Sequence, residues 1–182
     1  MSINLPGHAP PPVGFEAPLE MLSACHARIE QQCATLQRLV QHVAVHGTDA
    51  QARSAAAGVM HYFDTAAVDH HADEEMDLFP ALIEAMAGSD AVCLRELTAG
   101  LATEHRELES RWRQVREALA QVAVAATTSL DADAIAAFVG IYQRHIAREE
   151  GELLPMAARL LDDDALDRVG RAMRERRGVA PV

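Results

Sequence analysis

Aromatic residues and cysteines are both scarce in this chain of 182 residues. Aromatic side chains make up 4% of it, and its three cysteines are Cys25, Cys33 and Cys93. The cysteines are odd in number and lack Cys-x-x-Cys spacing, which fits reduced thiols in the cytoplasm better than a disulfide framework. Runs of β-branched residues are also few, so the sequence gives little support for β-sheets.

Long hydrophobic runs and an excess of positive charge are missing too. No run of about 18 apolar residues occurs, so we expect no membrane-spanning helix. The formal net charge is −11, which disfavours nucleic acid as a partner because an acidic protein repels phosphate backbones. The N-terminal segment MSINLPGHAPPPVG has no basic or strongly apolar region. We therefore expect no signal peptide and a flexible tail over residues 1–17.

The residues that are abundant favour helices. Ala, Leu, Glu, Gln and Arg dominate, and 49% of the chain is apolar, which predicts one all-α domain with a continuous core. The four long helices are predicted from Pro18 to Gly47, from Thr48 to about Ala87, from Ser89 or Asp90 to about Ala126, and from Asp131 to about Leu161. Internal prolines should kink or end the second and fourth of these helices, at Pro80 and Pro155.

A short fifth helix should follow the acidic residues 162–164 and end near Gly178. This divides the chain into a tail at 1–17, a bundle at 18–161 and a C-terminal segment at 162–182. Four arginines of that segment are expected to face solvent at the end of the fifth helix, with a docking or anion-binding patch as the less favoured alternative: Arg171, Arg174, Arg176 and Arg177.

The chain also repeats itself. HHADEEMDLFP at 70–80 aligns with HIAREEGELLP at 145–155, and LSACHARIE at 22–30 aligns with LATEHRELE at 101–109. Both matches occur in the same order and both contain histidine. The sequence therefore predicts two related helix hairpins, each with histidine-bearing helices.

Polar residues interrupt the apolar face of every long helix. His70 and Glu74 are four residues apart and share a helix face, as do His145 and Glu149. His26 and His105 interrupt similar apolar stripes on the first and third helices. Buried imidazoles and carboxylates are costly unless they are paired or bind a metal, and this combination suits iron, manganese or zinc.

These motifs resemble the hemerythrin-like, or HHE cation-binding, family over roughly residues 18–160. The resemblance rests on His26, on the two His-x-x-x-Glu motifs at 70–74 and 145–149, and on Glu104-His105. It implies an up-down-up-down four-helix bundle that holds two iron ions, bridged by two carboxylates and a solvent-derived oxo or hydroxo group. By the same resemblance, the predicted ligands are His26 and His70 on one iron, His105 and His145 on the other, and Glu74 and Glu149 as bridges.

One departure from the oxygen-carrying members affects the expected function. Those proteins have a fifth histidine one turn before the ligand of the third helix, where this chain has Leu101. An open coordination position favours exogenous ligands and redox chemistry over simple oxygen carriage. We expect a protein that binds or senses dioxygen, nitric oxide or iron. The alternatives are an enzyme acting on peroxide, nitric oxide or dioxygen, an iron donor for iron-centre repair, and a metal-free structural bundle.

Several further residues are open to two interpretations. His71 with Glu75 forms a rival His-x-x-x-Glu pair, but His71 aligns with Ile146 in the repeat, which disfavours it as a ligand. Tyr142 fits the metal site and the apolar core equally well. Glu75 and Glu150 could support the ligands from outside or be exposed, and exposure is favoured. Glu30 and Glu109 follow His26 and His105 by four residues and could bind the metal, but we expect them to be exposed too. The other histidines are expected at the surface: His8, His42, His46 and His61.

Overall fold

The computed structural model describes residues 14–86, 91–127 and 129–180, and these residues are all-helical, without a strand. The helical segments in chain order are α1 (Pro18–His46), α2 (Ala50–Asp64), α3 (Ala66–Asp73), η1 (Glu74–Leu78), α4 (Phe79–Ala85), α5 (Ala91–Ala123), α6 (Ala132–Arg148), η2 (Glu149–Leu153), α7 (Leu154–Leu160) and α8 (Asp163–Arg176). The predicted fold class, a helical bundle with a short fifth helix, is confirmed.

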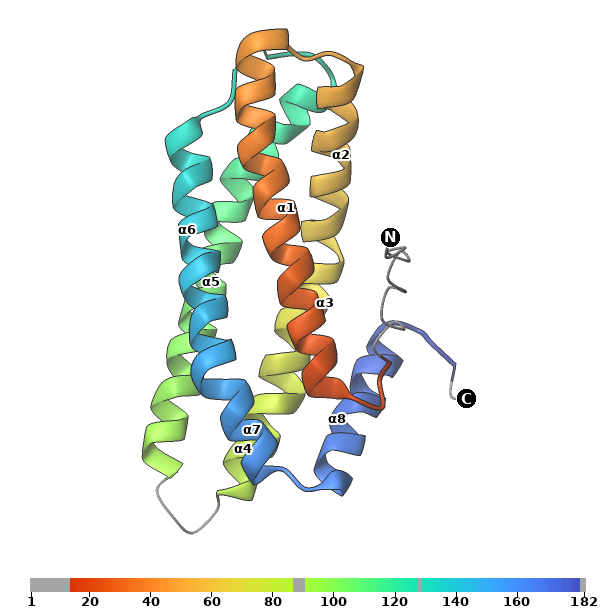
Figure 1. Cartoon of the computed structure of the whole chain (residues 1–182), viewed down its shortest axis with the longest axis vertical. Coiled ribbons are helices and arrows are strands. Elements are labelled where there is room, and N and C mark those ends of the chain that lie inside the picture. The colour runs from red at the N-terminus through yellow and green to blue at the C-terminus, as the bar shows by residue number, and fades with distance from the viewer. Residues whose placement is uncertain (1–13, 87–90, 128, 181–182) are drawn as a thin grey trace, which may run out of the picture.

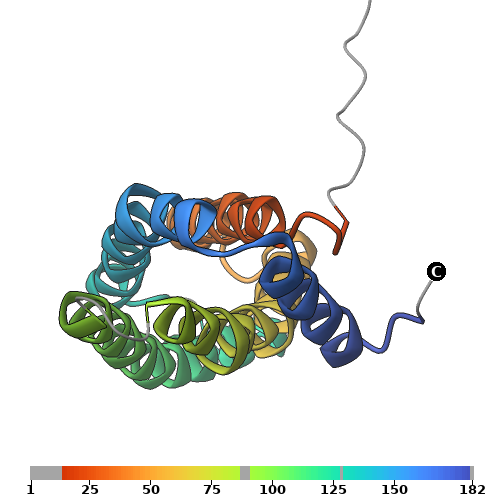
Figure 2. The ribbon, with the colours of Figure 1, turned by 90° about the horizontal axis from the view of Figure 1, so that it is seen from below.

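These segments form four long rods around a common axis (Figure 1). The first rod is α1 and the third is α5, whereas the second runs from α2 through α4 and the fourth from α6 through α7. Successive rods run in opposite directions, and each packs against its two neighbours. Seen along the axis in Figure 2, α8 lies outside this ring of rods, where it packs against α1 and α3.

Acidic side chains begin three of the helices. The Asp49 carboxylate accepts a hydrogen bond from the Ala52 amide at 2.8 Å, so α2 starts after Asp49 rather than after Thr48 as predicted. Asp131 and Asp162 cap α6 and α8 in the same way, by accepting hydrogen bonds from backbone amides of the first turn. The predicted start of the third long helix at Ser89 or Asp90 lies outside the described residues.

A wider helical turn precedes each internal proline. Residues Glu74–Leu78 and Glu149–Leu153 form π-helical turns, in which the Phe79 amide donates to the Glu74 carbonyl and the Leu154 amide to the Glu149 carbonyl. A proline lacks an N–H and crowds the carbonyl four residues earlier, and the wider turn relieves that conflict. The regular α-helix is therefore interrupted as predicted, but the rods continue and both wide turns begin at a predicted bridging glutamate.

The second rod also has a break that the sequence did not predict. Thr65 lies between α2 and α3 with φ −128° and ψ −82°, outside the helical region. Its hydroxyl donates to the His61 carbonyl at 2.7 Å, and its amide donates to the Tyr62 carbonyl at 3.3 Å. A threonine side chain that bonds to the preceding turn competes with regular helix geometry.

The core has two apolar layers. One contains Ile29, Phe63 and Phe138, and the other contains Leu22, Leu101 and Leu153. The scarce aromatic residues concentrate in the first layer, where ring centroids lie 4.8–5.7 Å apart among Phe63, Trp112, Phe138 and Tyr142. In the sequence of each rod, the buried histidines and glutamates fall between residues of these two layers.

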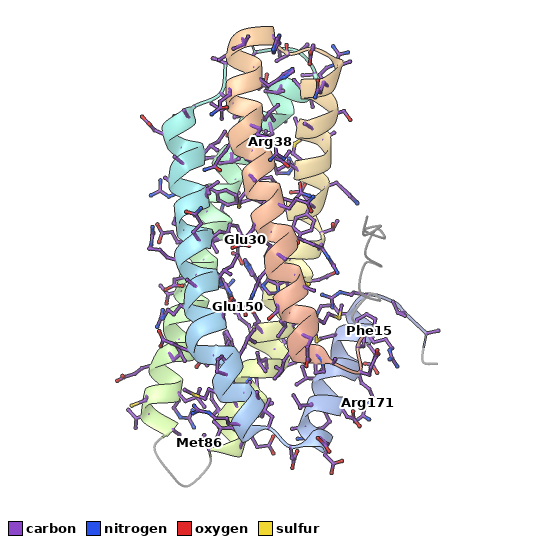
Figure 3. The ribbon with its side chains drawn as sticks, in the orientation of Figure 1. Phe15, Glu30, Arg38, Met86, Glu150 and Arg171 are labelled. Carbon is purple, nitrogen blue, oxygen red and sulfur yellow. The ribbon has the colours of Figure 1, made fainter. Side chains whose placement is uncertain are left out.

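Helix α8 is attached through a buried aspartate that pairs with two arginines. Arg171 is exposed as expected, but the expectation that Arg176 and Arg177 face solvent was wrong. Asp73 is fully buried, and it pairs with Arg176 and, at 2.6 Å, with Arg177. Arg176 also pairs with Asp77 at 2.7 Å. The Arg174 guanidinium lies 5.5 Å from the centroid of the Phe15 ring, which lies beside α8 in Figure 3.

Replacing Arg177 with alanine should therefore destabilise the fold. We expect the R177A variant to lose about 1–3 kcal/mol of unfolding free energy, because buried Asp73 would keep only one of its two arginine partners. Urea denaturation of the purified protein measures this loss. The matched control is R171A, which changes an exposed arginine of the same helix and should be neutral. Equal stability of the two variants would contradict the importance of this ion pair.

Candidate metal centre

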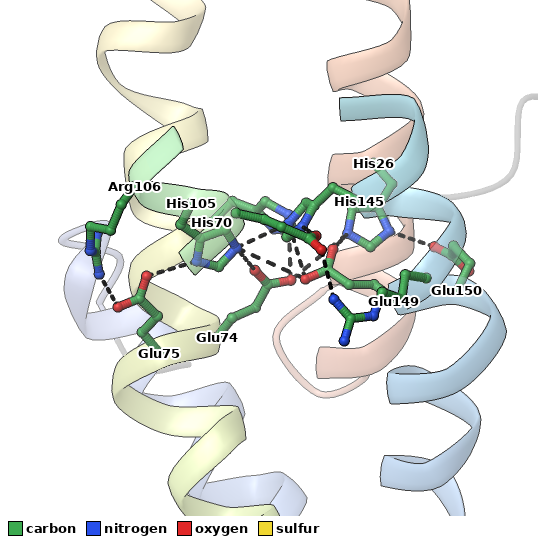
Figure 4. A network of polar contacts seen from close by, with 11 residues as sticks. His26, His70, Glu74, Glu75, His105, Arg106, His145, Glu149 and Glu150 are labelled. Atoms are coloured by element: carbon green, nitrogen blue, oxygen red, sulfur yellow. Dashed lines mark hydrogen bonds and ion pairs between the residues drawn. The ribbon is translucent and has the colours of Figure 1, made fainter. Parts of the chain in front are cut away.

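All six predicted ligands meet in one buried layer, and each of the four rods contributes to it. His26 comes from α1, His70 and Glu74 from the second rod, His105 from α5, and His145 and Glu149 from the fourth rod (Figure 4). None of the six is more than 2% exposed. The sequence placed them on inward helix faces, and the fold brings those faces together.

The six residues form two overlapping groups. In each group, one possible ligand atom per residue lies within 4.8 Å of all the others. The groups are His26, His70, Glu74 and Glu149, and Glu74, His105, His145 and Glu149. Each group thus has its own histidine pair and both share the two carboxylates, which is the division that the resemblance implied. Glu149 lies 3.1 Å from His26 Nε2 and 3.2 Å from His145 Nε2, so one carboxylate reaches both halves.

The donor atoms of this layer fit bound cations. Within the part of the chain that the structure describes, eight buried side-chain atoms make no hydrogen bond: both oxygens of Glu74 and of Glu149, both ring nitrogens of His70, and Nε2 of His26 and of His71. Buried polar atoms are almost always paired, so six of these atoms point to an absent cation: the four glutamate oxygens and Nε2 of His26 and of His70. His105 Nε2 and His145 Nε2 lie 3.0 Å apart, a separation suited to two ligands of one ion.

The protonation of these residues depends on their neighbours. Burial lowers the pKa of His70 to about 3, and burial together with the charge of Glu74 raises the pKa of Glu149 to about 8. Burial also acts to lower the pKa of His26, but the close approach of the Glu149 and Glu74 carboxylates, 3.1 and 3.8 Å from its Nε2, outweighs burial and raises that pKa to about 11. Protons on His26 and Glu149 therefore offset part of the buried negative charge. A bound cation would displace these protons and take over that role.

Three further carboxylates hold the outer nitrogens of the histidines. Glu150 lies 2.6 Å from His26 Nδ1, Glu75 lies 2.7 Å from His105 Nδ1, and Glu104 lies 2.8 Å from His145 Nδ1. These contacts fix ring orientation and leave Nε2 directed into the layer. Glu150 is exposed as expected and Glu75 is half-buried, but both also contact ligand histidines, which was the less favoured alternative. Each reaches the histidine of the other hairpin, an arrangement that only the assembled bundle reveals (Figure 4).

The fourth histidine lacks such a contact, and the repeat explains why. In the repeat, His70 corresponds to His145, and the residue corresponding to Glu104 is Cys25. A buried thiol cannot replace a carboxylate as a strong acceptor, and His70 Nδ1 has no partner among the described residues. The two halves of the site therefore differ in their outer contacts.

The other candidate residues that the structure describes are either exposed or buried in the aromatic part of the core, apart from one half-buried histidine. Glu30 and Glu109 are exposed, as expected, and Glu30 is visible on α1 in Figure 3. Tyr142 is buried against Phe63 and Phe138, and burial raises the pKa of its phenol well above the usual range. His42 is half-buried and lies 3.0 Å from Asp49.

His71 is buried as well, only 9% exposed, although the sequence gave it little weight. Its ring lies parallel to that of His105, with the ring centroids 4.0 Å apart. The signal that could have found it is the His-His pair itself, because adjacent helical residues at the edge of a wide apolar face can both be buried.

Residues 17–157 match the family described as "Hemerythrin HHE cation binding domain". The chain belongs to this family. Within it, a protein of Haemophilus influenzae (strain ATCC 51907 / DSM 11121 / KW20 / Rd), described only as an uncharacterized protein, is 32% identical over 165 residues, which cover 91% of this chain and 92% of that protein. Membership of the HHE family confirms the resemblance and agrees with the buried histidine and glutamate groups as a cation site.

Proposed function

We propose that this HHE domain holds two iron ions in the buried layer. His26 and His70 would bind one ion, His105 and His145 the other, and Glu74 and Glu149 would bridge them. The observation that carries the proposal is the sharing of both carboxylates between the two groups, combined with the unpaired buried atoms. Manganese or zinc could occupy the same ligands, since imidazole and carboxylate suit all three metals.

When bound, iron would supply one-electron redox chemistry and an open position for a small ligand. The protein's own residues prepare the site. Glu75, Glu104 and Glu150 orient the imidazoles and make them stronger donors through their Nδ1 contacts. Leu22 and Leu101 are fully buried in one of the apolar layers, which limits the access of water to the site.

The role that we infer is binding or sensing of dioxygen or nitric oxide, or of iron itself. The alternative is a di-iron enzyme acting on peroxide, nitric oxide or dioxygen, or an iron donor for iron-centre repair. Leu101 is buried and brings no nitrogen to the layer, so one coordination position of the bound iron would lack a protein ligand. This favours the binding of exogenous ligands over stable oxygen carriage. No helix among the described residues is long and apolar enough to cross a membrane. We propose that the protein acts in the cytoplasm.

The reaction of the ferrous protein with dioxygen tests this role. We expect the ferrous protein to be oxidised rapidly in oxygenated buffer, without reversible uptake of dioxygen. Stopped-flow absorbance measures the rate of this oxidation. Replacing Leu101 with histidine should slow the oxidation at least about tenfold, a barrier change of about 1.4 kcal/mol, by filling the open position. The matched control is L101M, which conserves volume and adds no imidazole.

Two results would contradict the role. Dioxygen that is bound by the wild-type protein and released under vacuum would identify a carrier. Equal oxidation rates for L101H and L101M, with iron fully bound in both, would show that Leu101 does not control the open position.

A further inference from the structure

His71 is a buried imidazole that has no assigned task. It is 9% exposed, and its Nε2 atom makes no hydrogen bond with any residue that the structure describes. One of its ring nitrogens lies within 4.8 Å of a nitrogen of His105 and of a nitrogen of His145. Leaving such a nitrogen unpaired is unfavourable, so its retention beside the second half of the site points to a partner that binds there.

The orientation of the ring argues against a fifth metal ligand. A metal ion lies in the plane of each imidazole that binds it. The rings of His71 and His105 are stacked with centroids 4.0 Å apart and planes inclined by only 13°, so the two planes do not converge on one ion. A ring nitrogen of His71 lies within 4.8 Å of nitrogens of His105 and His145, so His71 would be a neighbour of the ion bound there rather than a ligand.

The repeat shows that this imidazole distinguishes the two halves. The position that corresponds to His71 in the second hairpin is Ile146, which is buried in the first apolar layer. The half with His26 and His70 therefore has no equivalent imidazole from the repeat. Among the described residues, the repeat thus places an additional imidazole beside the half with His105 and His145 and an isoleucine at the matching position.

We propose that His71 is a positioning residue that hydrogen-bonds, through Nε2, to a small anionic or polar ligand bound at the His105–His145 half of the centre. This inference rests on the proposed di-iron function and specifies which half takes the exogenous ligand. The ring is held by stacking on His105 and by Tyr142, whose ring centroid lies 6.1 Å away. A neutral imidazole with its proton on Nε2 donates to a ligand such as azide without contributing a bond to the metal.

Azide titration of the iron-loaded ferric protein, followed by optical absorbance, tests the proposal. The decisive variant is H71I, because isoleucine is the residue at the matching position of the second hairpin. It should keep the iron content of the wild type but bind azide about 10- to 100-fold more weakly, as expected for the loss of one hydrogen bond to a charged group. H71Q should recover most of the affinity through its amide N–H. H61I, which changes an exposed histidine of α2, should behave as the wild type.

The possible outcomes are distinct. Unchanged or tighter azide binding by H71I at full iron content would overturn the proposal, as would a failure of H71Q to recover affinity. An H71I protein that holds only one iron would make His71 a ligand and would also overturn it. A wild-type protein that does not bind two iron ions would instead overturn the proposed function on which the inference rests.

Discussion

Removing the metal should lower the melting temperature by about 8–16 °C for each ion lost, while leaving helix content almost unchanged. Bound at about a thousand times its dissociation constant, one ion contributes about 4 kcal/mol to stability, and each kcal/mol corresponds to about 2–4 °C in a protein of this size. The metal-free protein must retain the buried side chains of Glu74 and Glu149, whose oxygens make no hydrogen bond, without a cation between them. The two apolar layers should keep the rods together, so circular dichroism should report melting from a helical state.

The control for this effect is a variant that cannot bind the metal. In a protein with both E74A and E149A, a chelator should not change the melting temperature, because the shared carboxylates are gone. Identical melting of the metal-loaded and metal-free wild-type protein would show that the buried groups are not stabilised by a common cation.

Replacing a single shared carboxylate should have a greater effect on metal content than replacing a histidine. E149A removes an oxygen donor from both groups, whereas H26A removes a donor from one group and leaves the other with all four residues. We expect E149A purified from iron-replete cells to hold less than one iron per chain, and H26A to hold about one. Metal analysis of both proteins measures this difference.

The chain offers matched controls for these variants. Glu30 and Glu109 follow His26 and His105 by four residues, the same spacing as in the two buried pairs, but both are exposed. E30A and E109A should therefore hold as much iron as the wild type. A loss of iron in either control, or equal losses in E149A and H26A, would contradict the assignment of Glu149 as a shared ligand.

The fold and the inner residues could be predicted because helix periodicity depends on local sequence. His70 with Glu74 and His145 with Glu149 share a face whatever the rest of the protein does, and the repeat links the two pairs. The apolar residues on either side of them require that this face be buried. The position of the polar layer in the bundle follows from those constraints alone.

The outer contacts could not be predicted in the same way, because they join residues far apart in the chain. Glu150 meets His26 and Glu75 meets His105 only after the two hairpins pack together. A glutamate on the edge of a helix looks the same in the sequence whether it faces solvent or a neighbouring imidazole. The pairing of Arg177 with Asp73 was missed for the same reason, since it depends on where α8 docks.

The π-helical turns could be predicted only in part. Pro80 and Pro155 predicted an interruption of the regular α-helix, but the sequence did not distinguish a kink from a π-helical turn. The choice depends on tertiary packing, because the wider turn keeps Leu78 and Leu153 buried in the core beyond the glutamates. Local propensity thus located the irregularity, and packing determined its form.

The most direct test of the di-iron proposal is the number and spacing of the metal ions in protein produced with ample iron. Metal analysis combined with X-ray absorption spectroscopy of the purified protein measures both quantities. We predict two iron ions per chain, separated by about 3.5–4 Å and bound by both nitrogen and oxygen ligands. A single ion per chain, or two ions without an iron–iron signal at that distance, would contradict the shared carboxylate centre.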